Sequence, residues 1–285
     1  MNPELLASIC AAIGVRLRTA TQVAGGCINA AYRLECQDGA RYFLKLGDAG
    51  QLPMFAAEAA SLAAMEQAIR VPRTLGHGVS GGHSYLLLEY LKLHADDSGA
   101  RLGERLAAMH RMTAPRFGFE HDNFIGTTPQ QNAWADDWIG FWRDRRLGPQ
   151  LQLAIRKGFR LQHAGDRLLA ALPALLRGHA PIPSLLHGDL WSGNHARLPC
   201  GTPVVFDPAA YYGDRECDIA MTELFGGFTA GFYAAYNASF PLDSGYAGRR
   251  DLYTLYHLFN HANLFGAGYA KQAEQMMLRL TASIS

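Results

Sequence analysis

The sequence has no excess of charge of either sign and no paired-cysteine motif. Its 26 lysines and arginines face 25 aspartates and glutamates, which leaves a formal net charge of +1. Such a balanced chain lacks the basic surface that binds nucleic acid or an anionic membrane, so we expect small-molecule partners. The five cysteines are an odd, scattered set without C-x-x-C spacing, which argues against a zinc finger or a disulfide scaffold and favours reduced thiols.

Long apolar runs are also missing. The longest uncharged stretch, residues 224–242, contains three glycines and Pro241, and it therefore predicts a buried helix and a loop rather than a membrane span. Glu4 precedes the first basic residue, so the start of the chain lacks the positive region of a secretory signal. These absences favour a cytoplasmic protein, and 285 residues suffice for one large domain or two lobes.

Strand patterns fill the first third of the chain, and helical patterns fill the rest. Residues 16–46 and 85–91 predict strands, and residues 54–69 have helical spacing after Pro53. Further helices are predicted at 102–112, 133–145, 159–176 and 252–264, and a long loop is predicted at 113–132. We therefore predict an α+β fold with a small N-terminal lobe (residues 1–91) of antiparallel sheet and one helix, followed by a larger, mostly α-helical lobe (residues 92–285).

Lys45 is predicted on an apolar sheet face. A two-residue turn at Asp38-Gly39 would pair Tyr32 with Lys45 and would put Lys45 on one face with Leu34 and Phe43. Glu58 lies on the apolar stripe of the helix that follows. Two buried opposite charges are expected to pair, although a lysine reaching solvent beside a frayed helix edge is the alternative.

The most informative stretch is residues 185–218. It contains L-L-H-G-D-L-W-S-G-N, then V-V-F-D-P-A, then G-D-R-E-C-D. Asp189 and Asn194 are five positions apart, and Asp207 follows eighteen positions after Asp189, behind an apolar run. This spacing is typical of kinases, in which an aspartate orients the acceptor hydroxyl and an asparagine and a second aspartate hold Mg²⁺. The alternative is a loop of turn-forming residues.

The order of motifs along the chain favours the kinase interpretation. A glycine-containing hairpin loop is followed by a strand lysine, a helix glutamate, a strand ending in Glu89-Tyr90-Leu91, and then the Asp…Asn…Asp series. Each part has the local structure that a kinase requires.

The chain resembles the fructosamine kinase (ketosamine-3-kinase) family, which shares the protein-kinase-like fold with aminoglycoside and choline phosphotransferases. The resemblance covers nearly the whole length. It depends on the segments 25–32, 43–45, 124–134 (F-I-G-T-T-P-Q-Q-N-A-W), 146–151 (R-L-G-P-Q-L), 187–194 (H-G-D-L-W-S-G-N) and 207–216 (D-P-A-A-Y-Y-G-D-R-E).

The resemblance implies a role for each matching residue. Asp189 would accept the proton, Asn194 and Asp207 would hold Mg²⁺, and Lys45 with Glu58 would position the phosphates of ATP. The nucleotide would also contact the segment Glu89, Tyr90 and Leu91 and the loop Gly25, Gly26, Cys27, Ile28 and Asn29. That loop is not G-x-G-x-x-G, so the phosphate clamp is implied by the family more than by glycine spacing.

The substrate is expected to be a small hydroxylated amine. Only ten residues separate Asp207 from Asp218, and Pro208 stands where protein kinases have the phenylalanine of D-F-G, so a peptide platform is disfavoured. The resemblance implies phosphorylation of the third sugar hydroxyl of ketoamines, either ribulosamines or fructosamines, in protein deglycation. An aminoglycoside- or choline-type phosphotransferase is the alternative, although the balanced charge of the second lobe does not favour a polycation.

The roles of the residues around this motif stay open. Trp191 either forms an apolar wall of the site that binds the sugar or its amine, or is a core aromatic residue that braces the loop. Asp214, Arg215 and Glu216 either contact substrate or form an ion network. His187 is expected to brace the loop, and Asp218 to tie down its backbone.

Three further features allow alternatives. Trp134, Trp138 and Trp142 recur every four residues and predict a buried helix stripe. His257 and His261 could mark a zinc hydrolase, but no H-E-x-x-H glutamate is present and ordinary helix histidines are favoured. Cys27 is either a small turn residue or a redox-sensitive thiol whose oxidation would obstruct ATP. The chain is expected to be a monomer or a redox-dependent dimer. A non-enzymatic binding module is disfavoured because Lys45 and the Asp…Asn…Asp series are all present.

Overall fold

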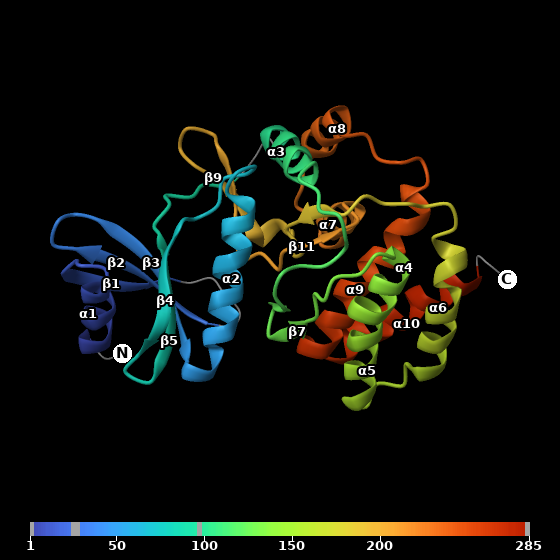
Figure 1. Cartoon of the computed structure of the whole chain (residues 1–285), viewed down its shortest axis with the longest axis horizontal. Coiled ribbons are helices and arrows are strands. Elements are labelled where there is room, and N and C mark those ends of the chain that lie inside the picture. The colour runs from blue at the N-terminus through green and yellow to red at the C-terminus, as the bar shows by residue number, and fades with distance from the viewer. Residues whose placement is uncertain (1–2, 24–28, 96–98, 283–285) are drawn as a thin grey trace. The chain divides into compact units, whose positions relative to one another are not determined.

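The structure is a computed structural model that describes residues 3–23, 29–95 and 99–282 (Figure 1). Contacts divide the chain into two compact units. The first unit comprises Met1–Asp96 with His195–Pro208, and the second comprises Asp97–Asn194 with Ala209–Ser285. The first unit therefore takes in a segment from late in the sequence in addition to the residues of the predicted N-terminal lobe.

The first unit is built on a five-stranded antiparallel sheet. Its strands are β1 (Leu17–Val23), β2 (Ala30–Cys36), β3 (Arg41–Asp48), β4 (Thr74–Ser80) and β5 (His83–Glu89), in the order β1-β2-β3-β5-β4. Two α-helices, α1 (Pro3–Ala12) and α2 (Leu52–Met65), and the short helix η1 (Ala49–Gln51) accompany it. A second, two-stranded ladder pairs β9 (His195–Arg197) with β10 (Pro203–Val205).

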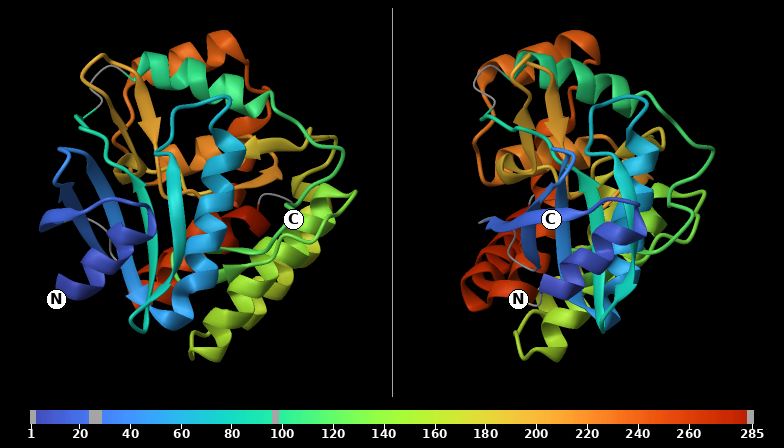
Figure 2. Two further views of the ribbon diagram at one scale, coloured as in Figure 1. Left: turned by 60° about the vertical axis from the view of Figure 1, so that its left-hand side comes forward. Right: turned by 90° about the vertical axis from the view of Figure 1, so that its left-hand side faces the viewer.

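The two faces of the sheet are covered by different helices. On one face Leu6 and Ile9 of α1 pack with Leu34, Leu44 and Leu87 of the sheet in a buried cluster. The other face receives α2, whose apolar stripe is buried, and Figure 1 shows α1 and α2 on opposite sides of the sheet. Figure 2 shows α2 lying along β4 and β5. Because side chains alternate between the faces of a strand, the residues next to Leu44 in β3 point toward α2.

The β2–β3 hairpin turns over three residues, so the predicted two-residue turn is wrong. The backbone N–H of Gly39 donates to the Cys36 carbonyl, and the N–H of Cys36 donates to the Ala40 carbonyl. Gly39 has φ of +84°, the left-handed conformation that closes a three-residue hairpin and that glycine adopts without strain.

This turn moves the register of β2 against β3 by one residue. Lys45 faces Ala31 rather than Tyr32, and Phe43 faces Arg33 rather than Leu34. Phe43 shares the Lys45 face as predicted, because the two residues are two positions apart in β3. Leu34 does not, since a shift of one residue transfers a side chain to the other face.

The second unit is mostly helical. Its helices are α3 (Ala100–His110), α4 (Trp138–Phe141), the π-helix η2 (Trp142–Leu147), α5 (Gly148–Arg156), α6 (Gln162–Leu175), η3 (Ser192–Asn194), α7 (Glu216–Leu224), α8 (Ala230–Ser239), α9 (Tyr246–Phe265) and α10 (Ala267–Ala282). Two short ladders pair β6 (Asn123–Ile125) with β7 (Thr128–Gln130) and β8 (Ser184–Leu186) with β11 (Tyr211–Gly213). The predicted α+β class, with strands first and helices later, is confirmed.

The predicted helix at 133–145 begins later than expected. Asp137 accepts a hydrogen bond from the backbone N–H of Gly140 and caps α4, so the helix starts at Trp138. Trp138 and Trp142 are buried with ring centroids 5.3 Å apart, as the stripe predicts. Trp134 precedes the helix and packs against Tyr212 instead.

The stretch 224–242 forms α8 with flanking loops, as expected. Within residues 3–23, 29–95 and 99–282, no helix combines the length and the apolar character needed to cross a bilayer.

Candidate active site

Lys45 of β3 lies between two carboxylates of the first unit. Its Nζ donates to Glu58 Oε1 and Oε2 of α2 at 2.7 and 2.9 Å and to Asp207 Oδ1 at 2.6 Å. Burial disfavours the ammonium, but the charges of Asp207 and Glu58 outweigh burial and raise the pKa of Lys45. The predicted pairing of Lys45 with Glu58 is present, and it supplies a permanently charged donor on the α2 face of the sheet.

Asp207 follows β10 in a strained backbone conformation. Its φ is +58°, a value that residues other than glycine adopt rarely and at a cost of about 1 kcal/mol or more. Its side chain is 42% exposed although one oxygen bonds to Lys45. Strain of this kind persists where the surrounding structure enforces it, and it is common at functional sites.

The end of β5 is fixed by an ion pair. Glu89 accepts two hydrogen bonds from Arg70 Nη2, both at 2.7 Å, and its backbone N–H donates to the Arg73 carbonyl. Tyr90 and Leu91 follow the strand, and the guanidinium of Arg41 lies over the Tyr90 ring. The end of β5 is therefore held in place by Arg70 and Arg73. Contact of residues 89–91 with adenine stays a prediction.

The predicted phosphate loop is described only at its last residue. Asn29 Oδ1 accepts a hydrogen bond from Gln51 Nε2 at 2.9 Å. The predictions for Gly25, Gly26, Cys27 and Ile28, including the redox role of Cys27, concern positions outside the described residues.

The second unit holds the segment 187–194, which we call the catalytic loop after the role predicted for Asp189. Its N-terminal end is bound by Asp218 of α7, whose two carboxylate oxygens accept the backbone N–H groups of His187 and Gly188 at 2.7 and 2.9 Å. Burial alone would raise the pKa of Asp218, but bonding to His110 and to the loop outweighs burial and lowers it. The expected role of Asp218 in tying down the loop backbone is confirmed.

Gly188 brings the loop close to the backbone of Ala209, which precedes β11. It has φ of +79°, and a Cβ at this position would lie 2.1 Å from the carbonyl oxygen of Ala209. Only glycine fits such a backbone approach. Asp189 is the next residue in the chain after this contact between Gly188 and Ala209.

Asp189 itself is half-buried and oriented by its neighbours. Its backbone N–H donates to His187 Nδ1 at 3.2 Å, so this ring nitrogen is an acceptor and His187 braces the loop, as expected. Asn194 Nδ2 donates to the Asp189 carbonyl at 2.9 Å and lies 3.4 Å from its carboxylate. Asn194 therefore closes the loop back onto Asp189.

A family model described as fructosamine kinase matches residues 5–283 of the chain. The chain belongs to the fructosamine kinase family.

Its relatives in the fructosamine kinase family extend over most of its length. The chain is 50% identical over 268 residues to a Synechocystis protein assigned as a ketoamine kinase, covering 92% of this chain and 90% of the relative. It is 42% identical over 264 residues to protein-ribulosamine 3-kinase, chloroplastic, of Arabidopsis thaliana, covering 88% and 79%. As a member of this family, the chain is a phosphotransferase.

Solved structures agree with this family and with its fold. A Haemophilus somnus protein assigned as a fructosamine-3-kinase has a TM-score of 0.89 at 30% identity, over 97% of each chain. The choline kinase LicA of Streptococcus pneumoniae has a TM-score of 0.69 at 13% identity, over 98% of each chain. The predicted kinase-like fold is confirmed.

In this member of the fructosamine kinase family, Trp191 lies at the surface of the catalytic loop. Its side chain is 37% exposed, and its ring lies over Gly193, where a Cβ would come within 2.2 Å of it. The ring therefore packs on its own loop and also faces solvent, so contact with substrate stays a prediction.

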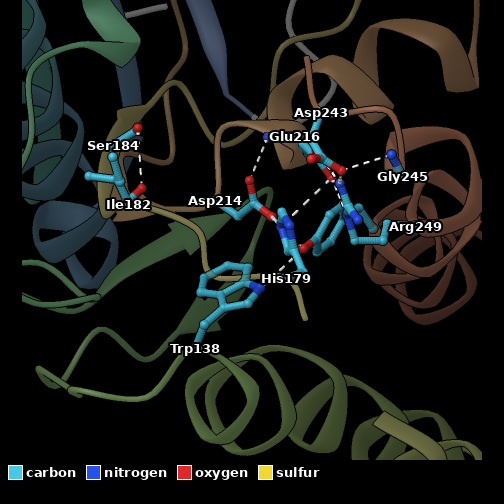
Figure 3. A network of polar contacts seen from close by, with 10 residues as sticks. Trp138, His179, Ile182, Ser184, Asp214, Glu216, Asp243, Gly245 and Arg249 are labelled. Atoms are coloured by element: carbon cyan, nitrogen blue, oxygen red, sulfur yellow. Dashed lines mark hydrogen bonds and ion pairs between the residues drawn. The ribbon is translucent and has the colours of Figure 1, made fainter. Parts of the chain in front are cut away.

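Asp214 and Glu216 belong to a buried polar network (Figure 3). Asp214 accepts hydrogen bonds from His179 Nε2 at 2.6 Å and from the Tyr253 hydroxyl at 2.5 Å. Glu216 accepts two from Arg249, both at 2.8 Å. Both carboxylates are 2% exposed and have internal partners, and their contact with substrate stays a prediction.

Arg215 also has internal partners. Its guanidinium donates to the Tyr236 hydroxyl at 3.1 Å and to the Phe240 carbonyl at 2.8 Å. The substrate role predicted for Arg215 likewise stays a prediction.

The same network contains the one potential metal cluster among the described residues, namely His179, Glu216 and Asp243. The Arg249 guanidinium donates to both the Glu216 and the Asp243 carboxylates, so these two groups already share a cation. His257 and His261 are not in the cluster. Burial lowers the pKa of His257 to about 3, and His261 Nδ1 bonds to the His257 carbonyl. Both residues therefore behave as ordinary helix histidines. The sequence favoured this interpretation over a role as zinc ligands.

Three supporting residues were not singled out from the sequence. His110 at the end of α3 bonds to Asp218 at 3.1 Å, and the side chains of Asn123 and Gln130 donate to the carbonyls of residues 210 and 209. A lone histidine at a helix end carries no signal. Asn123 and Gln130 flank the turn of the β6–β7 ladder. Both lie in the predicted long loop, and Gln130 also lies in the segment 124–134 that carries the resemblance, but neither position was assigned a role.

Proposed function

We propose that this phosphotransferase moves the terminal phosphate of ATP to the third hydroxyl of a ketoamine, a sugar joined to an amine. The name of the Arabidopsis relative specifies a ribulosamine and the 3-position, and the Synechocystis relative is assigned to ketoamines. Phosphorylation there destabilises the adduct and releases the free amine, which would make the reaction a deglycation of lysine side chains.

The observation that carries the proposal is the arrangement of the catalytic loop. Asp218 holds the loop backbone through two hydrogen bonds, Gly188 sets its turn, and Asn194 closes it on Asp189. A half-buried carboxylate fixed in this way can orient an acceptor hydroxyl and take its proton at one carboxylate oxygen. Phosphoryl transfer requires mainly this positioning together with charge neutralisation.

The charged groups of the first unit suit the nucleotide phosphates. The Lys45 ammonium stays protonated because Glu58 and Asp207 surround it, so it can donate to a phosphate oxygen at any physiological pH. Glu58 fixes the lysine side chain from α2. We assign the phosphate-positioning role to this pair and adenine contact to Glu89, Tyr90 and Leu91.

The remaining donors fit a magnesium ion. Asp207 offers a carboxylate that is 42% exposed, and Asn194 offers an amide oxygen, both of which are hard ligands that Mg²⁺ prefers. When bound, Mg²⁺ would neutralise the charge that develops on the transferred phosphate. We therefore propose Asn194 and Asp207 as its ligands.

The proposed setting is the cytoplasm. Cys10, Cys36, Cys200 and Cys217 are all free thiols, as in a reducing compartment. A redox-dependent dimer stays a proposal beside the monomer.

The test is ATP consumption with Mg²⁺ against ribulosyl-lysine, fructosyl-lysine, free sugars, an aminoglycoside and choline. We expect turnover with the ketoamines and its loss on chelation of Mg²⁺. Turnover with the aminoglycoside or choline and none with a ketoamine would replace the proposal by the alternative phosphotransferase.

The assignment of Asp189 is tested by Asp189→Asn. This variant should keep the Tm and ATP binding and lose at least about 100-fold in kcat, because the proton acceptor is gone. Asp166→Asn, which changes an exposed aspartate of α6, is the matched control and should keep full activity. Wild-type turnover in Asp189→Asn would refute the assignment.

A further inference from the structure

Four aromatic side chains gather where α7, α9 and α10 come together. Phe225 follows α7, His261 and Phe265 lie in the last turns of α9, and Tyr269 lies in the first turn of α10. The His261 ring is central, with its centroid 4.7 Å from that of Phe225, 5.4 Å from Phe265 and 5.1 Å from Tyr269. We call these residues the aromatic cluster.

The aromatic cluster is open to solvent. Phe225 is 39% exposed and Phe265 is 59% exposed, which makes them the two phenylalanines with large exposure among the described residues. Single exposed apolar side chains are ordinary, whereas a group of them often marks a binding site.

The cluster is continuous with the catalytic loop. The chain after Phe225 passes so close to the loop that a Cβ at Gly227 would lie 2.5 Å from Ser192 Cβ. Helix α7, which leads to Phe225, begins with the turn that holds Asp218 and thereby the loop backbone.

The chemistry of the cluster suits an organic cation. Because the His257 carbonyl can only accept, His261 Nδ1 must carry the proton of their 2.9 Å hydrogen bond. Burial lowers the pKa of His261, so the ring is neutral and its Nε2 presents a lone pair. Aromatic faces attract ammonium groups, and a ring nitrogen lone pair accepts one N–H.

We propose that the aromatic cluster binds the protonated secondary amine of the ketoamine substrate and the first methylenes attached to it. The inference rests on the proposed function, because that function supplies the amine. About four bonds, or roughly 5 Å, separate the third sugar oxygen from the amine nitrogen. A site for the amine must therefore adjoin the catalytic loop, and the chain that follows Phe225 does so at Gly227 and Ser192.

The test compares a ketoamine with an uncharged isostere. Phe265→Leu keeps an apolar side chain and removes the ring, and Leu278→Ala truncates another exposed side chain of the α9–α10 pair as the matched control. The substrates are ribulosyl-lysine and the ether in which oxygen replaces its amine nitrogen. KM and kcat are measured for each, with an inhibition constant if the ether is not turned over.

We expect Phe265→Leu to raise KM for ribulosyl-lysine about threefold to tenfold, the range of one cation–π contact, and to change kcat less than about twofold. The constant for the ether should not change, and Leu278→Ala should match the wild type with both. An equal change for amine and ether, or no change for either, would overturn the proposal.

A second measurement separates this inference from the proposed function. N-methylbutylammonium chloride is titrated into the wild type and into Phe265→Leu by calorimetry. If no ketoamine is phosphorylated, the proposed function fails, and weaker ammonium binding by Phe265→Leu alone would still support the cation site. Equal binding by the two proteins would overturn the site whatever the substrate proves to be.

Discussion

Replacing Gly188 by alanine should displace the loop that carries Asp189. The new Cβ would lie 2.1 Å from the Ala209 carbonyl oxygen and 2.8 Å from its carbon, so the backbone must move by about 1 Å. Gly178→Ala is the matched control, because Gly178 has a similar φ of +74° with nothing within 4 Å of a Cβ. Both variants incur about 1 kcal/mol for the left-handed conformation.

The extra cost at Gly188 has two sources. Overpacking against backbone costs about 1–3 kcal/mol, and moving Ala209 weakens the hydrogen bond that its carbonyl accepts from Gln130, which is about 1 kcal/mol more. Gly188→Ala should therefore be about 2–4 kcal/mol less stable than Gly178→Ala. For a chain of this size that difference lowers Tm by about 5–10 °C.

The assays are thermal unfolding followed by circular dichroism and steady-state phosphotransfer. Because a misplacement of about 1 Å can cost about 100-fold in rate, we expect Gly188→Ala to lose about that much in kcat and Gly178→Ala to keep the wild-type value. If the two variants had the same Tm and the same kcat, the argument from close backbone approach would be wrong.

Three further predictions follow from buried groups. Burial raises the pKa of Cys10 to about 12 and also raises that of Cys36, so neither thiol should react with a disulfide reagent at pH 8 until the chain unfolds. The lowered pKa of Asp218 adds stability above about pH 4 that is lost as the pH falls through its folded value, so Asp218→Asn should have a lower Tm at pH 7 and a flatter Tm between pH 5 and 3. Arg249→Met should cost about 3 kcal/mol and lower Tm by several degrees, because it leaves the buried Glu216 carboxylate without its cation.

The prediction of the Lys45–Glu58 pair does not depend on the register of β2 against β3, which was predicted wrongly. The two side chains meet because Lys45 alternates with Leu44 and Leu46 along β3 and because Glu58 lies on the apolar stripe of α2. Neither fact depends on which residue of β2 lies opposite. The partner in β2 was wrong because a two-residue and a three-residue turn both accept an Asp-Gly pair with Gly39 at positive φ. A two-residue type I′ turn also needs positive φ at Asp38, and Asp38 does not have it.

The supports of the catalytic loop could be predicted only in part. Asp218 stands near the loop motif in sequence and was expected to bind the backbone. Its other partner, His110, lies more than a hundred residues earlier, and such a long-range contact leaves no local pattern. The start of α4 was missed although Asp137 is a good helix cap, because the four-residue tryptophan spacing extends one turn before it.

The first unit is discontinuous in sequence, which limits how the protein can be divided. A fragment ending at residue 96 would lack Asp207, so Lys45 would keep Glu58 and lose its second carboxylate. It would also lack β9 and β10, whose Arg197 and Val204 form bridges to His94 and Arg70. The two units are thus distinct by their contacts but interleaved in the gene, and neither corresponds to a single uninterrupted stretch of codons.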